Sequence, residues 1–251
     1  MDLSLNTICL RTMINFSTRK LLLNRRWMMV VLVSVFVALI MGYVAIQQNT
    51  DPLEGGSFLL NTLVLTFLLP IMALIYGASM IRNDIDDRSI TSIVTSPMDR
   101  RVGYLGYYLA LVVVLSLMLL VIGVVGWASF YLIQGVEREA IDLLLAYSLL
   151  LVIGGVVYSS LFLVMGVVLR QPIYLGLLYA FVWEALVGSL PGAIGQLTII
   201  HNLKVIGADL IHHGSIAETS GDPVTAALVL AGVTVLLIAL GALAFKEKEL
   251  P

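Results

Sequence analysis

Leu109–Val125 reads LALVVVLSLMLLVIGVV, and this stretch decides the class of fold. It lies within a run from Val102 to Val136 that contains no charged residue. A helix needs about 20 apolar residues to cross the hydrocarbon core of a bilayer. A membrane-spanning β-strand would instead alternate apolar and polar residues over about ten positions. Because the stretch does not alternate, it predicts a transmembrane helix.

The composition of the whole chain is that of a membrane protein. Of 251 residues, 60% are hydrophobic and 12% are charged, whereas soluble domains have about 45–50% and about 25%. A single cysteine, Cys9, excludes a disulfide scaffold. A net charge of −2 and a pI near 5.9 give no basic surface for nucleic acid.

Clusters of charge divide the chain into six apolar runs, and each run is long enough for one membrane crossing. Glu184 is the one charged residue inside the fifth run. We therefore expect an all-α membrane protein, with a cytoplasmic segment over residues 1–26 and a six-helix transmembrane domain over residues 27–251. The expected spans are residues 27–48, 58–82, 103–133, 143–169, 171–189 and 223–245.

The positions of Lys and Arg predict the orientation. If both termini lie on one side, that side carries twelve of the fourteen Lys and Arg residues, and only Arg138 and Lys204 lie on the other. Cytoplasmic segments of membrane proteins carry an excess of these residues, so we expect both termini in the cytoplasm. The expected location of the protein is the cell (plasma) membrane. The basic segment before the first span has no short apolar region ending at a small-residue cleavage site, so it is not read as a cleavable signal.

The segment before the first span has the pattern of an amphipathic helix. Over residues 5–26, Arg11, Arg19 and Arg26 fall on one stripe of a helix, and apolar side chains gather on another. This pattern predicts a helix that lies along the inner membrane surface. An ordinary basic anchor beside the first span would look the same, and both interpretations remain open.

The loop over residues 82–101 combines charge with apolar positions at helical spacing. Eight of its twenty residues are charged, while Ile90 and Ile93 are apolar and Pro97 marks the end of a helix. A short helix with an apolar face suits a groove on another protein, although a solvated connector is the alternative. Metal binding by Asp84, Asp86 and Asp87 is disfavoured because arginines flank them and no His or Cys joins them.

The stretch Gly77–Ala110 resembles the region around the second and third helices of ABC-2 type transporter permeases. Their acidic segment corresponds here to Asp84, Asp86 and Asp87, their short apolar helix to Ile90–Val94, and their Pro-x-x-Arg element to Pro97–Arg100. Arg88-Ser89 and Gly106-Tyr107 stand where Gly-Thr and Gly-Lys are usual. Trp183-Glu184 followed by Leu190-Pro191-Gly192 resembles bacterial and archaeal members.

The resemblance implies a six-span ABC-2, or type V exporter-like, fold and one half of an ATP-driven exporter. It implies pairing with a second copy or a related permease, and binding of two copies of a cytoplasmic ABC ATPase. The contact elements it implies are the amphipathic helix with Arg11, Arg19 and Arg26, and a coupling helix in the second cytoplasmic loop. The residues of that coupling contact are Asp84, Asp86, Asp87, Arg88, Ile90, Ile93, Pro97 and Arg100.

The chain contains no Gly-x-x-x-x-Gly-Lys-Ser/Thr loop, so it has no phosphate cradle of its own. We expect no enzyme activity and no cofactor in this chain, with ATP and Mg on the partner ATPase. The apolar spans suit a hydrophobic or amphipathic substrate. An ion-coupled carrier or channel that uses Glu184, and a structural subunit without a transport path, remain as alternatives.

Glu184 lies inside an apolar run, where a charged carboxylate costs about 2.5–3.5 kcal/mol on insertion scales. It is expected either to line the translocation path or dimer seam, or to be a hydrogen-bonded structural residue near the outer interface. Beyond it, Pro191 and several glycines predict a break, followed by an external segment before the last span. That segment holds His201, His212 and His213, which lack the spacing of a metal site, so no metal is expected.

Overall fold

The structure is a computed structural model that describes residues 12, 14, 18, 27–47, 51–86, 100–189, 195–211, 216, 219 and 221–247. Within these residues all regular structure is helical, which confirms the predicted all-α class. Five helices are long and apolar enough to cross a membrane. Their bounds are Trp27–Gln47, Pro52–Arg82, Arg101–Gln134, Arg138–Val168 and Pro223–Glu247.

The second long helix changes its winding along its length, while the others are regular. It begins as α3 (Pro52–Leu59), widens into the π-helix η1 (Leu60–Leu68) and continues as α4 (Leu69–Asp86). The other long helices are α2 (Trp27–Gln47), α6 (Arg100–Gln134), α7 (Arg138–Val168) and α10 (Pro223–Glu247).

The predicted fifth span, residues 171–189, is a shorter and less regular helix than the other five. It is made of α8 (Pro172–Leu178), the π-helix η2 (Tyr179–Leu186) and the 3-10 turn η3 (Val187–Ser189). Pro172 stands in its first turn, where a missing N–H costs nothing. The sixth crossing therefore stays a prediction. The 3-10 turn η4 (Gly195–Leu197) and the amphipathic helix α9 (Ile199–Leu210) follow before α10.

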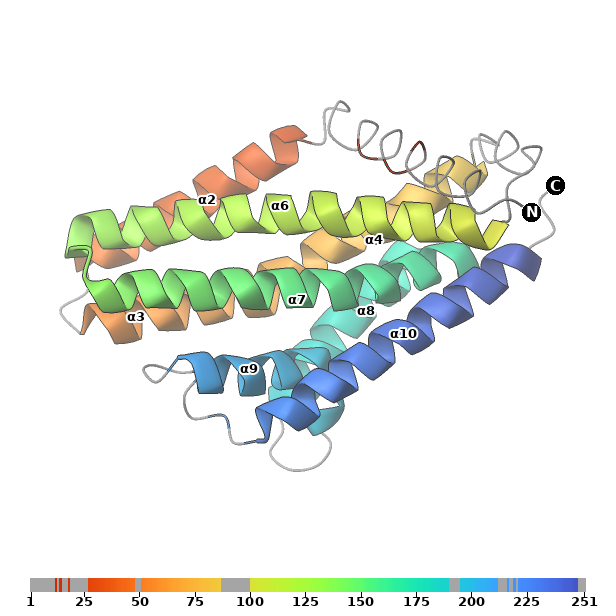
Figure 1. The fold of residues 1–251 in the computed structure, drawn as a ribbon. Helices are drawn as coiled ribbons and strands as arrows, with labels where there is room; N and C mark the ends of the chain where they lie inside the picture. Colours follow the sequence, from red (N-terminus) through yellow and green to blue (C-terminus); the bar gives the residue numbers. More distant parts are fainter. Residues whose placement is uncertain are drawn as a thin grey trace.

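Helix α7 is the centre of the bundle and packs against α4, α6, α8, α9 and α10 (Figure 1). The end of α4, the start of α6 and the end of α10 lie at one end of the bundle (Figure 1). The hairpin between α6 and α7 and the start of α3 lie at the other end (Figure 1). Helix α9 lies beside α7 and α10 near the second end.

Glycines let these helices approach one another closely. A methyl group on Gly154 would lie 2.6 Å from a methyl carbon of Leu69, and one on Gly126 would lie 2.8 Å from Met41 Sδ. Small residues at helix crossings favour packing of membrane helices because the backbones come close. Both glycines are thus used for packing between helices of a single chain.

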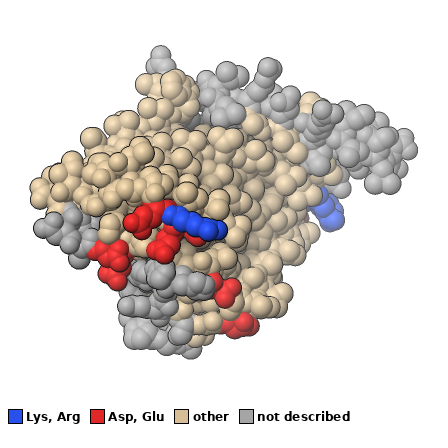
Figure 2. All heavy atoms as spheres, turned by 60° about the vertical axis from the view of Figure 1, so that its left-hand side comes forward, with Lys and Arg blue, Asp and Glu red and all other residues tan. Residues whose placement is uncertain are grey.

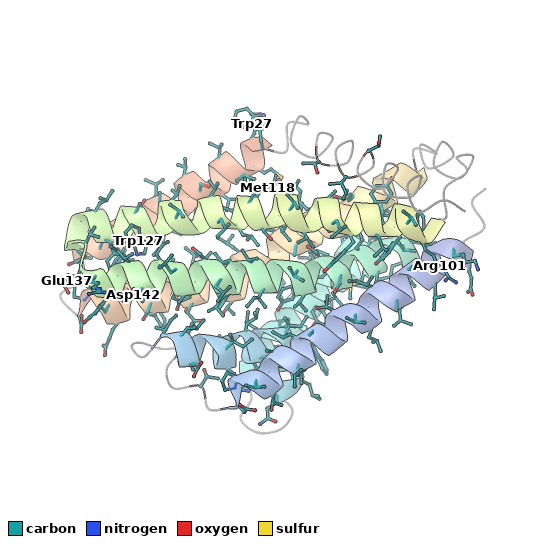
Figure 3. All side chains as sticks on the ribbon, viewed as in Figure 1. Trp27, Arg101, Met118, Trp127, Glu137 and Asp142 are labelled. Atoms are coloured by element: carbon teal, nitrogen blue, oxygen red, sulfur yellow. The ribbon has the colours of Figure 1, made fainter. Side chains whose placement is uncertain are left out.

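The two ends of the bundle differ in charge. Arg101 lies at one end, and Glu137 and Asp142 lie at the other (Figure 3). Acidic side chains gather on the surface at the second end, beside a basic side chain (Figure 2). They are Asp51, Glu54, Glu137, Glu139 and Asp142. The orientation predicted from the Lys and Arg residues would place this acidic end outside the cell.

Hydrogen bonds to backbone carbonyls join the helices at the acidic end. Trp127 Nε1 donates to Ala140 O at 2.7 Å, and Tyr147 Oη donates to Ser57 O at 2.8 Å. Gln134 Nε2 donates to Ala45 O at the end of α2. Ala45 O lies in the last turn of α2, where a carbonyl has no partner within the helix, so Gln134 satisfies it. The other two hydrogen bonds tie α6 to α7 and α7 to α3.

The turn between α6 and α7 depends on Gly135, whose φ is +108°. Residues with a side chain are strained at this angle. A methyl group on Gly135 would meet no neighbouring atom within 4 Å, so the free-energy cost of replacing Gly135 comes from the backbone angle alone. We expect Gly135→Ala to destabilise the protein by about 1–3 kcal/mol. A thermal melt in detergent against Val136→Ala, its neighbour in the same turn, measures this cost. Equal melting temperatures for the two variants would contradict the expectation.

Candidate functional site

A buried carboxylate, Glu184, links η2 to the start of α9. The side chain is 1% exposed. Its Oε1 accepts hydrogen bonds from Tyr179 Oη at 2.5 Å and from the Ile199 backbone N–H at 3.3 Å. Its Oε2 accepts from the Ile200 backbone N–H at 3.0 Å. Both oxygens are thus bound by groups of the same chain.

The contact meets a need of α9 that its own sequence satisfies only in part. The first N–H groups of a helix have no partner within it, and they give the N-terminus a partial positive charge. Thr198, the N-cap residue, accepts a hydrogen bond from the His201 N–H. Glu184 takes the N–H groups of Ile199 and Ile200, so a carboxylate from another helix completes the cap.

Aromatic rings hold Tyr179 in the position from which it donates to Glu184. Phe162 on α7 meets the ring of Tyr179 edge to face, with centroids 6.2 Å apart. Tyr158, one turn earlier on α7 and completely buried, stacks on Phe162 at 6.0 Å. The three hydrogen-bond donors therefore offset the free-energy cost of burying a carboxylate in an apolar helix, and the aromatic rings hold one of these donors in place.

The geometry defines how Glu184 is bound, and it bears on the two roles expected for this residue. The role of a hydrogen-bonded structural residue agrees with this geometry, because both carboxylate oxygens accept hydrogen bonds and all three donors belong to the same chain. A role in the translocation path or the dimer seam would need the carboxylate to reach beyond its own chain, and this role stays a prediction.

A second feature is a groove between the two π-helices. Its volume is about 140 Å³, and its lining comes from η1, the start of α4 and η2. The rings of Phe67 and Phe181 meet there edge to face, with centroids 5.9 Å apart. The remaining lining residues are Thr62, Thr66, Pro70, Ile71 and Ala180.

The groove arises where the helices depart from regular winding. Pro70 has no N–H and cannot complete the backbone ladder at the end of η1. π-Helical turns are rare and are often found at functional sites. Thr62 and Thr66 are four residues apart in a lining that contains no charged side chain, and the Thr66 hydroxyl is buried. Sequence reasoning missed this groove, although threonines at this spacing before a proline were a signal in the second span.

The predicted ATPase contact is only partly within the described residues. Asp84 and Asp86 lie in the last turn of α4, and Arg100 begins α6. These helix ends lie at the same end of the bundle (Figure 1). The other predicted contact residues lie outside the described residues, namely Asp87, Arg88, Ile90, Ile93, Pro97, Arg11, Arg19 and Arg26. The coupling helix and the amphipathic helix therefore stay predictions.

Of the external histidines, His201 lies on α9, while His212 and His213 lie outside the described residues. Burial and the neighbouring Lys204 lower the pKa of His201, so the neutral form is favoured. Among the residues described, no group of three His, Cys, Asp or Glu side chains is arranged to hold a metal ion.

Taken together, the fold defines a helical, multi-pass membrane protein. The sequence pattern of the ABC-2 family transporter proteins matches residues 20–191 of this chain, which is 172 of its 251 residues. The chain belongs to this family, and the suspected resemblance is confirmed. It is therefore a membrane-embedded transport subunit without a catalytic domain of its own. The family implies an ABC ATPase partner, and its members usually bind no cofactor. No curated protein matches the chain.

Proposed function

We propose that this chain is the permease subunit of an ABC exporter, in which two permeases form the path and two cytoplasmic ATPases drive it. The family match carries the proposal, because ABC-2 permeases work with a separate ATPase. The five long apolar helices supply the membrane domain. The lack of a phosphate-binding loop assigns nucleotide hydrolysis to the partner. The second permease is another copy of this chain or a related one.

We place the translocation path along the groove between η1 and η2. In this proposal, residues 171–189 cross the membrane as the fifth of six spans, beside the second. The exposed rings of Phe67 and Phe181, together with the exposed Thr62, suit a hydrophobic or amphipathic substrate. A charged substrate would find no opposite charge among the residues that line this groove.

The ATPase would bind at the end of the bundle that carries Arg101, which we place on the cytoplasmic side of the cell membrane. There the segment between α4 and α6 carries Ile90 and Ile93, the predicted apolar face of the coupling helix. An apolar helical face that enters a groove of the ATPase would transmit its movements to α4 and α6. The basic N-terminal helix would make the second contact.

The double change Ile90→Asp with Ile93→Asp is expected to abolish binding of the ATPase. A carboxylate in a buried apolar contact costs several kcal/mol, which lowers the affinity by at least about a hundredfold. Pull-down of the tagged permease, co-expressed with the ATPase encoded beside it, measures the loss.

Val136→Asp is the matched control, because Val136 is an exposed apolar residue in the hairpin at the opposite end. Its variant should bind the ATPase like the unchanged protein. Retention of the ATPase by the double variant would reject the coupling contact. A permease that elutes with no ATPase under any condition would favour a carrier coupled through Glu184, or a structural subunit.

A further inference from the structure

Helix α9 packs on α7 and α10 and is also attached to η2 within the described structure. Its apolar face packs on α7 through glycine contacts, where Gly154 faces Leu203 and Gly207 faces Leu150. Its N-terminal end is attached to η2 through Glu184. The packing on α7 is apolar and non-directional. The attachment to η2 is a directional contact between a carboxylate and two N–H groups.

A second close approach supports the attachment of α9 to the fifth helix. A methyl group built on Gly188 would lie 3.1 Å from Ile200 Cγ2 and 3.2 Å from Thr198 Oγ1. Gly188 follows Glu184 by four residues, so both lie on one face of a helix. The end of η2 and the turn η3 thus contact the first residues of α9 along one helical turn.

From this geometry we infer that Glu184 is a positioning residue that fastens α9 to η2, so that the two move as one body. The transmission of movement rests on the proposed function, because η2 also carries Phe181 in the proposed path. When the groove between η1 and η2 changes shape, η2 carries the external helix α9 with it. The external end of the path then opens and closes together with the groove.

The attachment itself is tested on the permease alone, in lipid nanodiscs, by hydrogen exchange. Glu184→Gln keeps the shape of the side chain but turns an amide N–H₂ towards a backbone donor. The retained oxygen can still accept from Tyr179 and Ile199, while the N–H₂ group faces Ile200. We expect the Ile200 amide to exchange at least about tenfold faster, as loss of a hydrogen bond to a charged acceptor implies, and the Ile199 amide to change less. Glu139→Gln, at an exposed carboxylate in the first turn of α7, is the matched control and should leave both rates unchanged.

A disulfide can replace the carboxylate contact and distinguishes positioning from any chemical role of Glu184. The Cβ position at Gly188 lies 3.7 Å from Thr198 Cβ, which is within the range that a disulfide requires. We would combine Gly188→Cys and Thr198→Cys with Glu184→Gln in a Cys9→Ser background, and compare it with the same cysteine pair carrying Glu184, because Thr198→Cys also removes the N-cap oxygen. Oxidation should restore the slow exchange of the Ile200 amide, and reduction should remove this protection.

Transmission is tested in the complex with the ATPase, using fluorescent amino acids incorporated at Leu145 on α7 and Leu210 on α9. Both side chains are exposed. The distance between them should change when the complex is trapped with vanadate. Glu184→Gln should reduce the change by at least about half at equal ATP hydrolysis, and the oxidised disulfide should restore it, as a rigid connection requires.

Unchanged exchange in Glu184→Gln would overturn the attachment. The transmission would be overturned if the distance in Glu184→Gln changed as much as in the unchanged complex. It would also be overturned if the oxidised disulfide did not restore the distance change. Failure of the proposed function looks different, because the ATPase would then not bind at all. The exchange results on the permease alone would still stand.

Discussion

Glu184→Ala is expected to lower the melting temperature of the purified permease by about 10 °C. The change leaves Tyr179 Oη and the N–H groups of Ile199 and Ile200 without their acceptor. Each buried donor that loses its partner costs about 1–3 kcal/mol. The Glu184 site is buried and Phe162 packs against the Tyr179 ring, so water does not easily replace the carboxylate there. Thermal unfolding in detergent, followed by tryptophan fluorescence, measures the effect.

Glu139→Ala is the control for this prediction. Glu139 is an exposed carboxylate in the first turn of α7, and removing it should change the melting temperature by at most about 2 °C. If Glu184→Ala melted as Glu139→Ala does, the carboxylate would not be holding α9 in solution.

The second large effect is expected at Gly166, where α7 crosses α4. A methyl group there would lie 2.8 Å from the Ala78 carbonyl oxygen and 3.4 Å from Ala78 Cα. Both atoms belong to the backbone of α4, so no side chain can rotate away. We expect Gly166→Ala to destabilise the protein by about 1–3 kcal/mol and Gly166→Val to prevent accumulation of folded protein.

Gly232 on α10 provides the matched control for this crossing. It lies in the interior of a long helix, and a methyl group on it would meet no atom within 4 Å. Gly232→Ala should be neutral or stabilise by up to about 1 kcal/mol, because alanine forms helices better than glycine. Folded yield on gel filtration and the melting temperature compare the two sites. A Gly166→Val protein as stable as Gly232→Val would contradict the close crossing.

The helical membrane fold could be predicted because its signal lies in composition and in charge spacing. The run around Leu109–Val125 has no charge and no alternation, and the structure places it inside one helix, α6. The positions of the charged residues define the helix ends less sharply than the apolar runs define the helical class. Helix α7, for example, begins at Arg138, ahead of the uncharged run, because charged residues are good helix formers outside the hydrocarbon.

The details of the candidate site could not be predicted in the same way. Glu184 stood out because a carboxylate is rare in an apolar run, but two of its partners are backbone N–H groups. Backbone donors have no residue identity, so no sequence pattern announces them. The groove depends on Phe67 and Phe181 meeting across two helices and on the π-helical winding of both. Neither the pairing nor the winding follows from hydrophobic periodicity.

The composition and mass of the complex formed with the neighbouring ATPase test the central claim most directly. We would co-express the tagged permease with that ATPase, purify in detergent, and determine stoichiometry by native mass spectrometry together with ATP hydrolysis. Two permeases with two ATPases, active in hydrolysis, is the predicted result. A permease that purifies without an ATPase, whether or not nucleotide is present, would contradict it.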